Sequence, residues 1–171
     1  MCKLVGCICV LGGVTGVLYD WIMTQKLIEN RIEEFLQFIH KSIFVMETEN
    51  IRIINLFMEY QTSDDLLEKS LHSIGNSLNE KRYPTGQEVW RAVFMDIRQE
   101  LGFDEELFQC ILHVANGFFG RSKQENISYL KRYFIEIERM QKQRKEKSKQ
   151  ERKVWIPIGV LGGVMTIILF I

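Results

Sequence analysis

The side chains of this 171-residue chain that could do chemistry are three histidines, a cysteine in mid-chain and two clusters of carboxylates. Histidines act as metal ligands or general bases when they converge with one another or with carboxylates on one site. His40, His72 and His113 lie far apart, and no two have the spacing that places a pair on one face of a helix. We therefore expect each of them to be a surface or half-buried residue of the fold.

The carboxylates and the cysteine also have structural explanations. Asp64-Asp65 and Asp104-Glu105-Glu106 stand where helices are expected to begin, and a helix N-terminus stabilises negative charge. Cys110 has no histidine near it in sequence and falls on an apolar helical stripe, so a buried thiol is expected. The chain also lacks phosphate-binding glycine loops, the Gly-x-Ser-x-Gly elbow and the His-Glu-x-x-His zinc motif. The sequence predicts no enzyme: no catalytic residue, no metal site and no cofactor.

The two ends of the chain are apolar, and the charged residues lie between them. Residues 4–19 and 154–171 carry no charge, although the chain has 22 basic and 22 acidic residues. About 20 helical residues cross the hydrocarbon of a bilayer, so we expect transmembrane helices over residues 1–23 and 154–171. A cleaved signal peptide is the alternative at the first end, but a small-x-small cleavage site followed by a polar mature start is missing there.

A basic stem over residues 142–153 precedes the second apolar stretch. A basic excess beside a span stays on the cytoplasmic side, which places the middle of the chain in the cytosol and both termini near the outer face of the cell membrane. The stem could attract anionic lipid, dock on an acidic partner or remain solvated. Aromatic residues are not interleaved with its charges, which argues against nucleic acid as a partner. The basic residues of the stem are Lys142, Arg144, Lys145, Lys147, Lys149, Arg152 and Lys153.

Glycines recur at small-xxx-small spacing in both predicted spans, at Gly12 with Gly16 and at Gly159 with Gly163. Small residues let membrane helices approach closely, so these four positions are expected to pack helices together. The partner helix belongs either to the same chain or to a second copy, and the pattern does not decide between them. Glycine is also simply commoner in membrane helices than in soluble ones.

The middle of the chain, residues 24–141, has the pattern of a helical bundle. Apolar residues recur at helical spacing over residues 24–48 and again after each of five helix-start signals. Six helices joined by short turns bury their stripes by packing together, so the predicted fold is all-α: an antiparallel six-helix bundle between N-terminal and C-terminal transmembrane helices. The five start signals are Asn50, Ser63, Thr85 with Glu88, Asp104, and Ser122 with Glu125.

Short motifs along the whole chain resemble the stage III sporulation protein AB family. They are Lys3-Leu4-Val5-Gly6 at the first span, Trp90 in mid-domain, the turn Gly120-Arg121-Ser122 and the closing run from Ile158 to Gly163. The chain departs from the family at Lys123, where an aspartate is usual, and at Ile127, where a glutamine is usual. These departures put in doubt a polar contact after the turn, but not the turn itself.

The resemblance implies a non-enzymatic membrane platform in the sporulation channel complex, on the mother-cell side of the membrane around the forespore. It implies a cytosolic domain similar to that of the type II secretion F protein. The partners it implies are membrane lipid and other stage III proteins, including a secretion-type ATPase, with possible self-association. The alternative is a membrane-anchored regulatory or ligand-relay protein, which should have a sizeable pocket with convergent polar groups.

Overall fold

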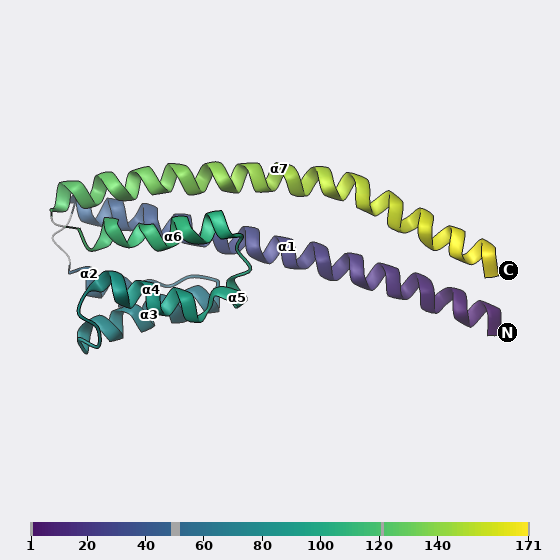
Figure 1. Ribbon diagram of the computed structural model, residues 1–171, viewed down its shortest axis with the longest axis horizontal. Coiled ribbons are helices and arrows are strands. Elements are labelled where there is room, and N and C mark those ends of the chain that lie inside the picture. Colours follow the sequence, from purple (N-terminus) through teal and green to yellow (C-terminus); the bar gives the residue numbers. More distant parts are fainter. Residues whose placement is uncertain (1, 49–51, 121, 171) are drawn as a thin grey trace. The chain divides into compact units, whose positions relative to one another are not determined.

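A computed structural model describes the backbone of residues 2–48, 52–120 and 122–170, and the side chains of these residues except in parts of the two apolar ends. Over these residues the chain is all-α, with seven helices and no strand (Figure 1). The helices are α1 (Cys2–Thr48), α2 (Ile53–Glu59), α3 (Asp65–Asn79), α4 (Gly86–Asp96), α5 (Arg98–Leu101), α6 (Glu105–Phe118) and α7 (Lys123–Phe170).

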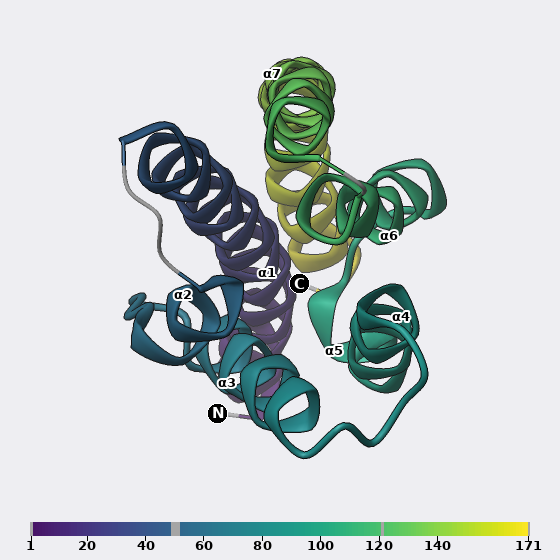
Figure 2. The same cartoon turned by 90° about the vertical axis from the view of Figure 1, so that its left-hand side faces the viewer.

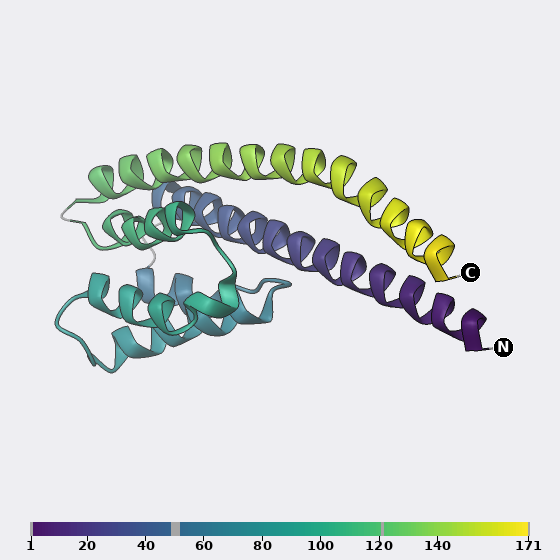
Figure 3. The same cartoon turned by 45° about the vertical axis from the view of Figure 1, so that its right-hand side comes forward.

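The helices form two compact units. Residues Asn30–Gln141 make one unit, called the body below, and the segments up to Glu29 and from Lys142 make the other, called the terminal helix pair. Within the body, α1, α2, α3, α4, α6 and α7 follow one another around a common core (Figure 2). Within the terminal helix pair, α1 and α7 lie side by side (Figures 1 and 3).

Three details differ from the sequence prediction. Helices α1 and α7 are continuous through the predicted span boundaries, because residues 20–30 and the stem contain neither proline nor glycine and are rich in helix formers. Pro157 therefore lies inside α7, rather than in the first turn of a separate helix. One additional helix of a single turn, α5, follows α4.

Helix caps agree closely with the predicted starts. Thr85, Asp104 and Ser122 each accept a hydrogen bond from the backbone amide three residues on, at 3.3, 3.0 and 3.3 Å. At α3 the cap is Asp64 instead of Ser63, because its carboxylate accepts from the Leu67 amide at 2.8 Å. The start signal at Asn50 lies outside the described residues.

The core of the body is aromatic. Trp90 touches several of the buried rings, and its centroid lies 4.6 Å from that of Phe94. The indole nitrogen of Trp90 donates to the Ile111 carbonyl at 3.0 Å, so the one polar atom of this ring is satisfied in the interior. Each large apolar side chain contributes about 1.5–3 kcal/mol when it is fully buried. The fully buried aromatic residues are Trp90, Phe35, Phe38, Phe57, Phe94, Phe108 and Phe118.

The turn between α6 and α7 requires glycine for a steric reason. A Cβ added at Gly120 would collide with the side chain of Asn126 and lie 2.9 Å from the Asn116 carbonyl oxygen. Asn126 is itself buried and donates from Nδ2 to the Phe118 carbonyl at 3.4 Å, which ties the start of α7 to the end of α6. Ser122 caps α7, while Arg121 lies outside the described residues.

Candidate interaction surface

The three histidines lie on different helices and do not converge. His40 is exposed on α1 and its ring lies 6.0 Å from that of Phe134, while His113 on α6 stacks on Tyr133. His72 on α3 has Nε2 3.2 Å from the Tyr60 carbonyl. Over the described ranges 2–48, 52–120 and 122–170, no group of three His, Cys, Asp or Glu residues could hold a metal ion.

Cys110 is buried in α6, and its thiol is not activated as a nucleophile. Burial raises the pKa of its thiol to about 12, and the negative charges of Glu136 and Glu106 act in the same direction. A thiol with this pKa stays protonated near neutral pH, and the thiolate is the nucleophilic form. The side chain is therefore part of the packed interior, as the sequence predicts.

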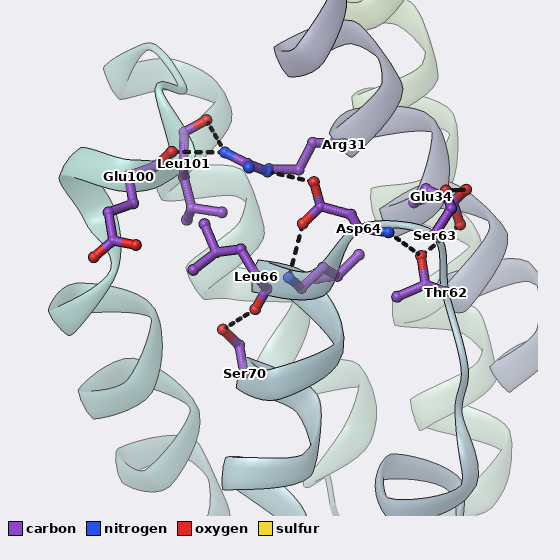
Figure 4. A network of polar contacts seen from close by, with 10 residues as sticks. Arg31, Glu34, Thr62, Ser63, Asp64, Leu66, Ser70, Glu100 and Leu101 are labelled. Atoms are coloured by element: carbon purple, nitrogen blue, oxygen red, sulfur yellow. Dashed lines mark hydrogen bonds and ion pairs between the residues drawn. The ribbon is translucent and has the colours of Figure 1, made fainter.

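The main buried ion pair joins three separate parts of the body and escaped sequence analysis. Arg31 on α1 donates from Nε to Asp64 Oδ2 at 2.9 Å, and from Nη1 to the carbonyls of Glu100 and Leu101 at 2.6 and 3.2 Å (Figure 4). Both side chains of the pair are about nine-tenths buried. The one sequence signal is that Arg31 interrupts the apolar stripe of α1 next to Ile32.

A second polar contact on α1 fixes the loop between α2 and α3. The carboxylate of Glu34 accepts hydrogen bonds from the hydroxyls of Thr62 and Ser63, each at 2.6 Å (Figure 4). The Tyr60 hydroxyl donates to the Glu34 carbonyl at 3.4 Å, and burial followed by the Glu34 charge raises the Tyr60 pKa to about 12. These contacts hold the loop between α2 and α3 in a fixed position beside α1.

A groove runs over the surface of the body along α1, bounded by α7 and by the loop that Glu34 fixes. Its first part has a volume of about 320 Å³ and its second part about 550 Å³, and both are lined by His40 and Phe134. Apolar residues dominate the first part, and polar residues dominate the rim of the second. The first part is also lined by Ile43, Phe44, Glu47, Lys131 and Ile135, and the second by Glu33, Leu36, Gln37, Lys41, Tyr60 and Gln61.

Apolar side chains stand out at the first part of this groove. Phe44 is 58% exposed and Ile135 is 64% exposed, although both belong to helices with buried apolar stripes. Lys131 Nζ and Glu47 Oε1 form an ion pair of 2.6 Å at the same end. In the second part the Lys41 ammonium lies 5.2 Å from the centre of the Tyr60 ring. Sequence analysis missed this surface, because Phe44 and Ile135 do not differ in type from their buried neighbours.

The basic stem is not a uniformly solvated helix. Ser148 is 4% exposed, and its hydroxyl finds no hydrogen-bond partner among the described residues. Arg152 Nη2 lies 3.9 Å from Glu29 Oε1 on α1, with both side chains mostly buried. Arg144 and Lys145 are half-buried, and the remaining four basic residues, Lys142, Lys147, Lys149 and Lys153, are exposed. One face of the stem therefore packs on α1 through polar side chains.

The predicted packing glycines fall into different environments. A Cβ at Gly159 would lie 2.9 Å from Leu18 Cδ1 on the neighbouring α1, whereas no atom of the described side chains lies within 4 Å of a Cβ at Gly12 or Gly16. The contacts of Gly163 lie outside what the structure describes. Searched over its described residues, no helix combines the length and the apolar character needed to cross a membrane. The two spans predicted over residues 1–23 and 154–171 thus lack structural support.

Taken together, fold and surface define an all-α protein whose body is a packed helical bundle. The chain matches the family of Stage III sporulation protein AB (spore_III_AB) over residues 3–171, and because this is nearly its whole length, it belongs to that family. Its role accordingly lies in stage III of sporulation, and the resemblance seen in the sequence is confirmed. No curated protein and no solved structure matches the chain.

Proposed function

We propose that this chain is a non-enzymatic platform of the stage III sporulation complex, held in a membrane by its terminal helix pair and presenting its body to partner proteins. The observation that carries the proposal is the family match over residues 3–171. The chemistry of the body agrees with it, since its histidines are dispersed and its cysteine is a buried thiol. Its surface also carries the groove along α1, which offers a place for a partner to bind.

The terminal helix pair supplies a physical reason for membrane anchoring. Large apolar side chains in aqueous solution cost roughly 25 cal/mol per Å² of exposed surface, and contiguous apolar surfaces usually mark an interface or a lipid contact. A membrane around this pair, with residues 1–23 and 154–171 within it, would remove that cost. The exposed apolar residues of the pair are Val17, Tyr19, Met23, Leu27, Val154, Trp155, Ile158, Leu161 and Met165.

The basic stem gives the proposal its orientation. Seven basic residues over 142–153 favour the cytoplasmic side, so the body would face the mother-cell cytosol at the membrane around the forespore. Gly159 allows α7 to approach Leu18 within the chain, while Gly12 and Gly16, which contact none of the described side chains, would pack against a helix of another chain. The proposed partners are membrane lipid and other stage III proteins, including a secretion-type ATPase.

Purification from sporulating cells tests this proposal. The full-length chain with an affinity tag is expressed in place of the untagged protein, and complexes are extracted in mild detergent from the membrane fraction. We expect co-purification of other stage III proteins and of the secretion-type ATPase. Recovery of the chain alone, or only outside the membrane fraction, would contradict it.

A variant with three charge reversals in the stem tests the role of the stem in the same purification. Lys147, Lys149 and Lys153 are exposed, so Lys→Glu changes at the three positions should leave the fold intact. We expect recovery of the membrane complex to fall, because each exposed cation near an anionic surface contributes about 1 kcal/mol. Reversal of Lys69, Lys81 and Arg82, which are exposed on the body, is the matched control.

A further inference from the structure

The groove along α1 has the dimensions of a site for a helix. It extends from Glu33 to Glu47, which at 1.5 Å per residue is about 21 Å, or four helical turns. The lining residues of the first part all come from α1 and α7, and in the second part Phe134 of α7 is joined by Tyr60 and Gln61, which the contacts of Glu34 with Tyr60 and the following loop hold in place. A groove between rigid helices is the usual receptor for an amphipathic helix.

The two parts of the groove require different side chains from an occupant. Ile43 and Phe134 line the first part while Phe44 and Ile135 stand exposed beside it, so covering this part removes a large apolar area from water. The Glu47–Lys131 ion pair closes that end and neutralises both charges. The first part therefore favours apolar side chains, and a charged side chain would gain no favourable binding free energy there.

At the level of Lys41 the groove favours a negative charge, whereas Glu33, which also lines the second part, lies eight residues or about 12 Å further along α1. Lys41 is exposed and contacts the Tyr60 ring, and it forms no ion pair with any residue in the described part of the chain. The neighbouring His40 ring makes no hydrogen bond within those same ranges and is also exposed. An occupant with a carboxylate at this level would meet an ammonium and an imidazole N–H.

Resting on the assembly role proposed above, we propose that this groove binds an acidic amphipathic helix of a partner protein. The helix would place an apolar stripe of i, i+3 or i+4, and i+7 spacing on Phe44, Phe134 and Ile135, and a glutamate or aspartate against Lys41. A second copy of this chain fits less well. A two-fold axis through the centre of the groove would bring two Lys41 side chains together, and like charges at an interface are unfavourable.

Photo-crosslinking in sporulating cells tests this assignment. A p-benzoylphenylalanine residue replaces Phe44 in the full-length chain, and in a control chain it replaces Met95, an exposed apolar residue of α4. After irradiation, the peptide attached at each position is identified by mass spectrometry. We expect position 44, and not position 95, to capture a segment of another protein with an apolar helical stripe and a nearby carboxylate.

Matched variants then test the chemistry of the contact. Ile135→Glu and Lys41→Glu should each reduce the crosslink from position 44 by about tenfold, since a charge placed in an apolar contact or a reversed charge at a small interface costs about a factor of ten in affinity. The controls Met95→Glu and Lys69→Glu should leave it unchanged. All four sites are exposed, and an unchanged thermal midpoint by circular dichroism would show that the body remains folded.

Several results would overturn the assignment. They are capture of a second copy of this chain, capture of lipid, equal capture at positions 44 and 95, no capture at position 44, or an undiminished crosslink in the Lys41→Glu chain. The purification of the tagged wild-type chain separates this failure from failure of the assembly role. If stage III proteins co-purify but position 44 captures none of them, the groove assignment fails and the platform role stands.

Discussion

Helices α1 and α7 pass through two regions that are packed in opposite ways. In the body they bury apolar residues completely, as at Phe38, Ile39, Leu130 and Ile137. In the terminal helix pair the same helices enclose polar side chains such as Ser148 and expose large apolar ones. The body is thus organised as a protein in water is, while the described part of the terminal helix pair exposes large apolar side chains at residues 17–27 and 154–165 and encloses polar ones at the stem.

This contrast shows where the stability of the chain resides. An aromatic core gains free energy by leaving water, so the body has its own driving force for folding. A mostly buried pair such as Glu29–Arg152 gives little net stability, because desolvation offsets the attraction between the charges. The terminal helix pair therefore depends on its surroundings. The first of the following experiments compares the two regions directly, and each of the others tests a buried polar group within one region.

The largest expected effect is in the aromatic core. Trp90→Ala should lower the free energy of unfolding of the body by about 3–5 kcal/mol, because it removes a fully buried ring and leaves a cavity. Trp155→Ala in the terminal helix pair, where the ring is half exposed, should change it by less than about 1 kcal/mol. Urea denaturation of the full-length chain in detergent, followed by circular dichroism, measures both. Equal losses would remove the distinction between the two regions.

The buried ion pair of the body comes next. Arg31→Ala should destabilise the body by about 3 kcal/mol, because it leaves the Asp64 carboxylate buried without its counter-charge and frees two carbonyls at the end of α5. Arg82→Ala, which breaks an exposed pair with Glu80, is the control and should cost less than about 1 kcal/mol. The same denaturation assay applies, and a loss at Arg31 no larger than that at Arg82 would show that the network in Figure 4 is dispensable.

A smaller effect of opposite sign is expected in the stem. Ser148→Leu should stabilise the packing of the terminal helix pair by about 1 kcal/mol, since it replaces a buried hydroxyl that has no partner among the described residues. Hydrogen exchange of the amides in residues 142–153 should slow by a few fold. Lys149→Leu, at an exposed neighbouring position, is the control. Faster exchange in the Ser148→Leu chain would mean that the hydroxyl is needed there.

The smallest effect near neutral pH concerns Cys110. Its pKa of about 12 in the fold exceeds the ordinary value of 9.0, so the folded chain retains a proton that the unfolded chain loses between these values. The contribution of the thiol to stability is therefore constant below pH 9 and declines as the pH rises towards 12. Denaturation of wild type and Cys110→Ala at pH 7.5 and pH 10 measures it. The wild type should lose more stability than the variant over this interval, and equal losses would contradict the burial argument.

Local sequence rules predict most of the fold. At Thr85, Asp104 and Ser122 a short side chain accepts a hydrogen bond from the backbone amide three residues on. Such caps can be recognised from residue type and spacing alone. The aromatic core likewise follows from apolar periodicity. Asp64 was missed as a cap, because Ser63 beside it is an equally good candidate by residue type.

The groove could not be predicted in the same way, for a physical reason. Periodicity assigns Ile43 and Phe134 to an inner face, but it does not indicate that Phe44 and Ile135 border a shared concavity, since these residues lie on helices far apart in sequence. The Arg31–Asp64 pair is also non-local, because its two residues are far apart in sequence. An arginine on an apolar stripe predicts a buried polar contact but does not indicate which residue forms it. The polar inner face of the stem escaped prediction because Ser148 resembles any solvated residue.

Labelling with a photoactivatable lipid tests the central contrast most directly. The full-length chain is reconstituted in vesicles that contain a diazirine-bearing phospholipid, irradiated and mapped by mass spectrometry. We expect label at the exposed apolar residues of the terminal helix pair, including Val17, Leu161 and Met165, and none at Phe44 or Ile135 of the body. Label on the body groove with none on the terminal helix pair would contradict the account.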